Sequence, residues 1–203
     1  MPKNSITRPE IMAVLIRMFE GKTSPESQNP RWGDYYLKAR ALGLTTVNNQ
    51  TLFDKQISRR EVAIYIYRLK NIVTNDSLRT FALNKISQIE NTTGGTIGTG
   101  VISDFSALAN SISVSNDPEL QEAISWMNDN GLTNATGVAG YKPFEILNRE
   151  QASKILYLFG RTFNFIVEVN SALPTECIFK DINAADGSLM TYVEKSCQAN
   201  IMK

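Results

Sequence analysis

The chain of 203 residues contains no histidine and only two cysteines. Histidine is the most common general base and a frequent metal ligand, so its absence argues against most hydrolytic and metal-dependent mechanisms. Two cysteines without histidine also leave a tetrahedral zinc site short of ligands. A glycosidase would need two convergent carboxylates, and nothing marks such a pair among Asp34, Glu61 and Asp181. We therefore expect a protein that is not an enzyme and has neither metal nor cofactor.

The chain also lacks a substantial net charge and a long apolar run. Its 21 basic and 20 acidic residues give a net charge of +1, so no overall attraction to nucleic acid is expected. No apolar run approaches the roughly 20 residues of a membrane-spanning helix, and the first residues do not resemble a signal peptide. With 42% hydrophobic residues, the chain can form a globular core.

Three segments share one helix-start pattern, in which a polar N-cap residue precedes an arginine. The copies are Ile6–Glu10, Ile57–Glu61 and Leu147–Gln151. In each copy, a glutamate or glutamine three residues after the cap can bond back to the cap's backbone N–H, which defines a capping box. The apolar residue before each cap is placed to pack onto the first turn. The pattern predicts three helices that begin in the same way.

Each copy has an arginine at the first helical position, namely Arg8, Arg59 and Arg149. The helix dipole is positive there, so a cation is unfavourable. Because an arginine nevertheless occupies this position in all three copies, we expect these arginines to hold an anion beside the helix N-terminus. The alternative is that they are surface side chains whose stems cover the core.

A shorter helix recurs between the capped ones and ends in glycine or asparagine. The capped helices are expected at 8–20, 59–70 and 149–162, and the shorter ones at 33–43, 119–131 and 188–200. This alternation predicts an all-α fold with internal repetition.

The repeated residues resemble the S-layer homology (SLH) family. Its repeat has a short helix, a loop and then a capped helix that opens with Ile-Thr-Arg-Ala-Glu. The matches are Thr7–Glu10, Ser58–Glu61 and, more loosely, Asn148–Gln151. Phe179–Ile182 is similar to the family's Phe-x-Asp-Val lead-in, and Trp32 falls at the family's tryptophan. The resemblance covers most of the chain outside residues 71–116.

The resemblance implies a pseudo-threefold helical bundle of three helix–loop–helix repeats, with residues 1–203 as one domain. It implies a noncatalytic cell-surface module that anchors to the cell envelope by binding anionic cell-wall polysaccharide between repeats. The alternative is a structural module that contacts other surface-layer subunits without binding glycan. The expected location is the extracellular cell surface, with any signal sequence outside these residues.

The candidate ligand-binding residues follow from this resemblance and from the repeated arginines. They are Arg8, Arg59, Arg149, Trp32 and Asp181. Trp32 has a second interpretation as an aromatic residue of the core.

The order of the helices leaves a capped helix, 8–20, at the start and a shorter helix, 188–200, at the end. We expect these two to pack together and close the repeats into a ring, since each would otherwise expose an apolar face. The alternative is a chain that is cut within a repeat.

Two cysteines, Cys177 and Cys197, bracket the last of the shorter helices. A disulfide between them would hold the preceding loop against that helix, and it agrees with the expected extracellular location. The alternative is a pair of buried free thiols.

Residues 71–116 are expected to be an insertion between repeats. Apolar residues at helical spacing predict one helix at 77–90 and a second at 103–113. The segment 91–100 is rich in glycine and threonine, which is typical of a flexible linker. It has no lysine and no strand before it, which argues against a phosphate-binding loop.

Overall fold

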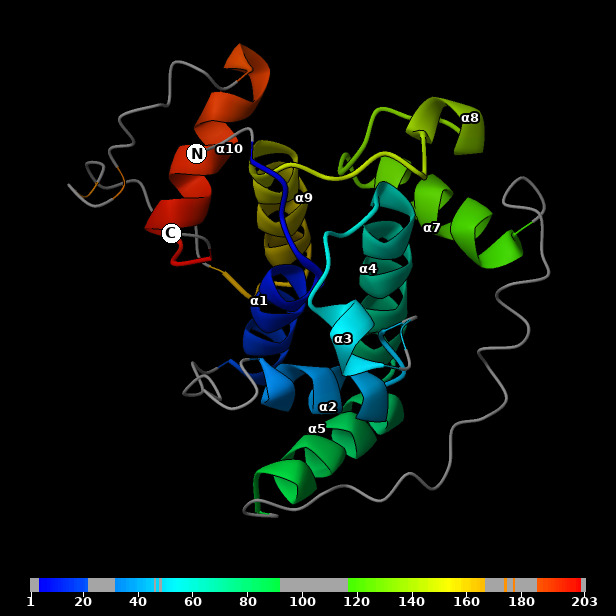
Figure 1. The fold of residues 1–203 in the computed structure, drawn as a ribbon, viewed down its shortest axis with the longest axis vertical. Coiled ribbons are helices and arrows are strands. Elements are labelled where there is room, and N and C mark those ends of the chain that lie inside the picture. The colour runs from blue at the N-terminus through cyan, green and yellow to red at the C-terminus, as the bar shows by residue number, and fades with distance from the viewer. Residues whose placement is uncertain are drawn as a thin grey trace.

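The computed structural model describes residues 4–21, 32–45, 47, 49–91, 117–166, 174, 177 and 186–201. Within these ranges the chain forms helices and no β-strand, which confirms the all-α class (Figure 1). The helices are α1 (Arg8–Glu20), α2 (Gly33–Ala41), α3 (Gln50–Phe53), α4 (Arg59–Val73), α5 (Asp76–Asn91), α7 (Pro118–Asp129), α8 (Val138–Tyr141), α9 (Arg149–Thr162) and α10 (Gly187–Gln198).

All the helices expected in the repeats are present, with small shifts at their ends. The helix expected at 77–90 is also present, as α5. The helix expected at 103–113 and the linker expected at 91–100 lie outside the described residues, apart from the end of α5. Capping boxes are present at the starts of α1, α4 and α9, because each N-cap is followed three residues later by Glu10, Glu61 or Gln151.

The residues before the three capped helices bond to one another in a closed cycle. The backbone N–H of Ile6 donates to Leu147, that of Leu147 to Ile57 and that of Ile57 to Ile6, each at 3.1 Å. All three side chains are buried. The cycle gathers the starts of α1, α4 and α9 at one place.

A second set of backbone bonds runs around the same cycle. The N–H groups of Arg8, Arg59 and Arg149 lie in first helical turns and have no partner within their own helices. They donate to the carbonyls of Lys55, Glu145 and Asn4, at 3.0, 2.9 and 2.9 Å. The loop before each capped helix therefore satisfies the first turn of another capped helix.

Each shorter helix packs against the capped helix that precedes it in the chain. The packed pairs are α1 with α2, α4 with α7, and α9 with α10. Between α9 and α10, the Ser196 hydroxyl donates to the Ser153 carbonyl at 3.0 Å, and the rings of Tyr157 and Tyr192 lie 6.2 Å apart.

The expectation that the first and last helices pack together is therefore wrong. In the described part of the chain, α1 packs against α2, α4 and α9, whereas the main partner of α10 is α9. Because α1 is surrounded in this way, its side chains Ile11, Leu15 and Ile16 are fully buried. Each capped helix already has a partner, so no end-to-end pairing is needed to cover an apolar face.

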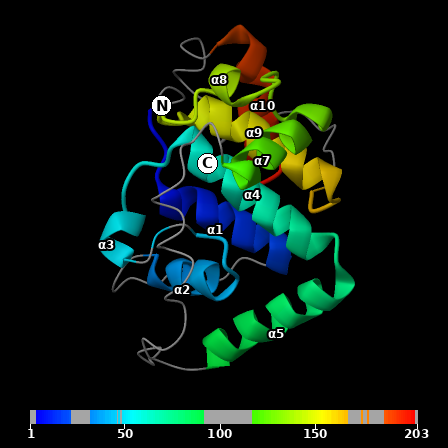
Figure 2. The ribbon, with the colours of Figure 1, turned by 90° about the vertical axis from the view of Figure 1, so that its right-hand side faces the viewer.

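Helix α5 packs against α2 and α4 at the end of the molecule opposite α8 and α10 (Figures 1 and 2). Its Glu90 carboxylate accepts from the Lys38 ammonium of α2 at 2.8 Å. The same ammonium donates to Glu20 at the end of α1, at 2.7 Å. One buried lysine thus joins three helices.

The expected disulfide is confirmed. Cys177 and Cys197 are bonded, with their Cα atoms 5.6 Å apart, and both are buried. The bond attaches the segment at Cys177 to the last turns of α10.

Replacing both Cys177 and Cys197 by serine is expected to lower the free energy of unfolding by about 3 kcal/mol. The bond closes a loop with a sequence separation of 20 residues, and its loss gives the unfolded chain more freedom. Urea unfolding of the variant and of the unreduced wild type measures this difference. Mass spectrometry after alkylation without reduction is the control, and two alkylated cysteines in native protein would contradict the prediction.

Candidate functional site

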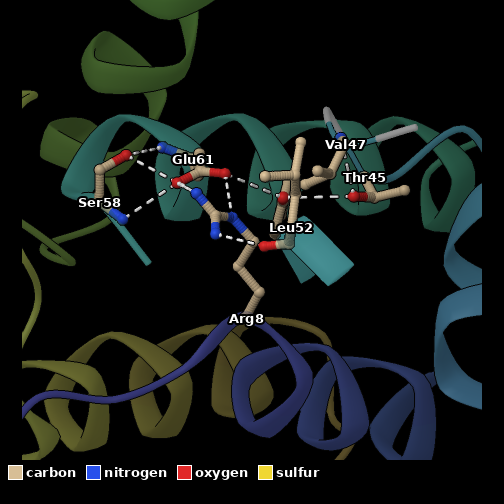
Figure 3. A network of polar contacts seen from close by, with 7 residues as sticks. Arg8, Thr45, Val47, Leu52, Ser58 and Glu61 are labelled. Atoms are coloured by element: carbon tan, nitrogen blue, oxygen red, sulfur yellow. Dashed lines mark hydrogen bonds and ion pairs between the residues drawn. The ribbon is translucent and has the colours of Figure 1, made fainter. Parts of the chain in front are cut away.

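The three repeated arginines occupy equivalent places in the chain, but they have different partners. Arg8 donates to both oxygens of the Glu61 carboxylate, through Nε at 2.5 Å and Nη2 at 2.9 Å. Its Nη1 donates to the carbonyl of Leu52 at 2.8 Å (Figure 3). Burial alone would lower the pKa of Arg8, but the bonds to Glu61 outweigh it and raise that pKa. Arg8 therefore links α1 to α4 as a permanently charged group.

Glu61 is the acceptor at the centre of this network. Its carboxylate also accepts from the backbone N–H and the hydroxyl of Ser58, at 3.1 and 3.0 Å (Figure 3). It accepts from the hydroxyl of Tyr65 as well, at 3.4 Å. The residue is only 8% exposed. Both carboxylate oxygens accept hydrogen bonds from groups of the protein itself. Because Arg8 is among these donors, the negative charge of Glu61 compensates the positive charge of Arg8.

Arg149 is placed in the same way. Its Nη2 forms an ion pair with Glu10 and so connects α9 to α1. Glu10 also accepts from the backbone N–H and hydroxyl of Thr7, at 2.9 and 2.8 Å. In both cases a capping-box glutamate serves its own helix and also binds the arginine of another capped helix.

Arg59 breaks this pattern. The residue at the corresponding capping-box position is Gln151, which carries no charge. The Nε–H of Arg59 instead donates to the carbonyl of Tyr141 at 2.7 Å, and its guanidinium lies 4.8 Å from the centre of the Tyr141 ring. Within the described ranges, no carboxylate forms an ion pair with Arg59. Burial raises the pKa of Tyr141, so the phenol stays neutral and donates to the Arg59 carbonyl at 3.0 Å.

Arg59 lines a groove with a volume of about 460 Å³, which we name the Arg59 groove. Lys154 and Gln151 of α9 line it as well, together with Asn134 and Thr136 from the segment after α7. No acidic side chain is among the described residues that line it. The groove thus combines two cations with neutral polar groups, which favours a ligand that carries a negative charge.

Trp32 lies on a different and smaller pocket, of about 270 Å³. Its other lining residues are Thr7, Pro9, Glu10 and Asp54, so this pocket carries carboxylates. The backbone of Trp32 has a φ of 66°, in the left-handed region that a bulky residue rarely adopts. The ring lies 6.0 Å from that of Tyr35.

Of the five residues expected to bind ligand, the four that the structure describes are not gathered in one site. Arg8 and Arg149 form ion pairs, Arg59 lines one groove and Trp32 another pocket. Asp181 lies outside the described residues.

Sequence reasoning missed Lys154 and the consequence of Gln151. The sequence could have predicted that these two residues lie together, since positions 151 and 154 share one face of a helix. A lysine on that face, together with a glutamine where the other copies have glutamate, marks the third copy as different.

In the part of the chain that the structure describes, no three metal-ligating side chains are grouped as a metal site would need. Among the same residues, no helix has the length and apolar character to cross a membrane. No family model, curated protein or solved structure matches this chain.

Proposed function

We propose that the protein is a noncatalytic module of the S-layer homology type that binds an anionic cell-wall polysaccharide in the Arg59 groove. The observation that supports the proposal most directly is the positive charge of Arg59, which is uncompensated by any described carboxylate. Arg59 is the repeated arginine without a carboxylate partner among the described residues, and it shares a groove with Lys154. This role would anchor a surface protein to the cell envelope.

The chemistry of the groove supports a carboxylate or phosphate on the glycan. A guanidinium can bond both oxygens of such a group, which a single ammonium cannot do with the same geometry. The Nε–H of Arg59 is already bonded to Tyr141, whereas its terminal nitrogens have no hydrogen bond to a described residue. Lys154 adds a second positive charge, and Asn134 and Thr136 offer polar groups for sugar hydroxyls.

The location proposed is the extracellular cell surface. The disulfide between Cys177 and Cys197 supports it, since such bonds persist in oxidising compartments and are rare in the cytosol.

Replacing Arg59 by alanine is expected to weaken binding to purified anionic wall polysaccharide by about 1–3 kcal/mol, because one charge-assisted contact is lost. Lys154→Ala is expected to act in the same direction. Calorimetric titration at fixed, low salt measures both effects, since ionic contacts are screened as salt rises. Lys85→Ala is the matched control, because it removes the same charge from an exposed site on α5. An Arg59→Ala variant that binds like the wild type would refute the proposal.

One observation favours the alternative, a structural module that contacts other surface-layer subunits. Phe144 is 73% exposed, and Leu52 and Ile146 are exposed as well, all in the segments that precede α4 and α9. Exposed apolar side chains of this size can mark a protein contact. If the wild type does not bind polysaccharide but self-associates in sedimentation experiments, this alternative replaces the proposal.

A further inference from the structure

We infer that Gln151 is the residue that keeps the Arg59 groove open, so that the chain binds anionic glycan at one groove and not at three. This inference rests on the proposed function, and it adds the number of sites and the residue that determines it. Gln151 acts here as a specificity-determining residue through its lack of charge.

In the other two copies, the residue at the third helical position has two tasks. Glu10 and Glu61 each close a capping box and each bind an arginine from another capped helix. Gln151 performs only the first of these tasks. Its Oε1 accepts from the Asn148 N–H at 3.4 Å, and its own N–H donates to Asn148 Oδ1 at 2.9 Å.

A neutral amide cannot replace the carboxylate in the second task. An ion pair such as Arg8–Glu61 gains from opposite charge and from two parallel hydrogen bonds. The amide of Gln151 offers one acceptor oxygen and no charge. Arg59 therefore bonds to a neutral carbonyl through Nε, and its positive charge stays uncompensated by any described carboxylate.

The other two arginines are poorly suited to an external anion. A ligand that approached Arg8 would have to displace Glu61, whose oxygens hold the cap of α4 and the Tyr65 hydroxyl as well. A ligand that approached Arg149 would meet Glu10, and the neighbouring pocket also carries Asp54. Like charges in a binding site oppose an anion.

The sizes of the grooves agree with this difference. The pocket that contains Glu10 measures about 270 Å³, and the Arg59 groove, which contains Gln151, measures about 460 Å³. At the Arg59 groove a ligand finds two cations and does not need to break an ion pair first. Preorganisation of this kind lowers the cost of binding.

The test is the substitution Gln151→Glu, which gives the third copy the residue that the other two carry. We expect affinity for purified anionic wall polysaccharide to fall at least about tenfold, as expected for the loss of one charge-assisted contact. Thermal stability is expected to stay the same or rise, since glutamate closes the capping box in α1 and α4. The wild type is expected to titrate with one site per chain when short polysaccharide fragments are used.

Gln88→Glu is the matched control, because it adds the same charge at an exposed site on α5, outside the Arg59 groove. We expect it to keep polysaccharide affinity within about twofold, so the two variants separate a charge inside the groove from a charge elsewhere on the surface. If the wild type binds and Gln151→Glu binds equally well, or if three sites titrate, this inference is wrong and the proposed function stands. If the wild type does not bind at all, both are wrong.

Discussion

Replacing Glu61 by alanine is expected to lower the free energy of unfolding by about 3–5 kcal/mol, the usual cost of leaving a buried charge without its partner. Glu61 is 8% exposed and pairs with Arg8 through both carboxylate oxygens (Figure 3). The substitution would leave the Arg8 guanidinium without its counter-charge and would also open the capping box of α4. Denaturant unfolding followed by circular dichroism measures the loss.

The matched control for this prediction is Glu119→Ala. Arg68 donates to both oxygens of Glu119, at 2.6 and 2.9 Å, so the geometry is the same as in the Arg8–Glu61 pair. The side chains of this pair are 25% and 35% exposed, and solvent-exposed pairs contribute about 0–1 kcal/mol. Equal losses for Glu61→Ala and Glu119→Ala would show that burial is not what makes the Arg8–Glu61 pair important.

The second large effect is expected at Lys38, which is 2% exposed. Its ammonium donates to Glu20 and Glu90, and the side chain of Glu20 is only 1% exposed. The substitution Lys38→Met keeps the apolar stem but leaves the Glu20 carboxylate buried without a cation. We expect it to lower the free energy of unfolding by about 3–5 kcal/mol, with Lys85→Met on the exposed face of α5 as a control. A Lys38→Met variant as stable as the wild type would contradict this prediction.

The pH dependence of this contribution follows from the pKa of Lys38. Burial alone would lower that pKa, but the bonds to Glu20 and Glu90 outweigh it and raise it above the ordinary value of 10.5. A raised pKa in the folded state gives a contribution that is fully present below pH 10.5 and is lost as pH rises through the folded pKa. The difference between wild type and Lys38→Met is therefore expected to be constant on the alkaline side of neutrality and to shrink only above that pH.

The contrast between Arg59 and the other two arginines shows which features a repeated motif predicts and which it does not. The motif predicted three capping boxes, and all three are present, because cap and third helical residue lie within one turn of helix. The same motif suggested three equivalent anion sites. It gave no sign that Glu61 and Glu10 would bind Arg8 and Arg149, since these partners are far apart in sequence and meet only when the three helix starts converge.

The pairing of helices shows a second limit. An alternating series of capped and shorter helices has two possible phases, because each shorter helix can pack on the helix before it or after it. Sequence reasoning chose the capped helix that follows, which left 8–20 and 188–200 to pair with each other. In the structure each shorter helix packs on the preceding capped helix, as α10 does on α9. The apolar faces are compatible with either choice, and only the complete packing selects one.

The sequence by itself determined the features of this protein that depend on neighbours within a few residues: the all-α class, the places of the capped and shorter helices along the chain and the three capping boxes. It also indicated the bond between Cys177 and Cys197. The tertiary structure alone decided which helices pack together, which arginines are neutralised and where the open groove lies. The reason is that a helix and its cap are stabilised by contacts within one or two turns, whereas the charge state of a groove depends on side chains from distant segments. Whether an arginine faces Glu61, Glu10 or Gln151 is settled only when those segments meet.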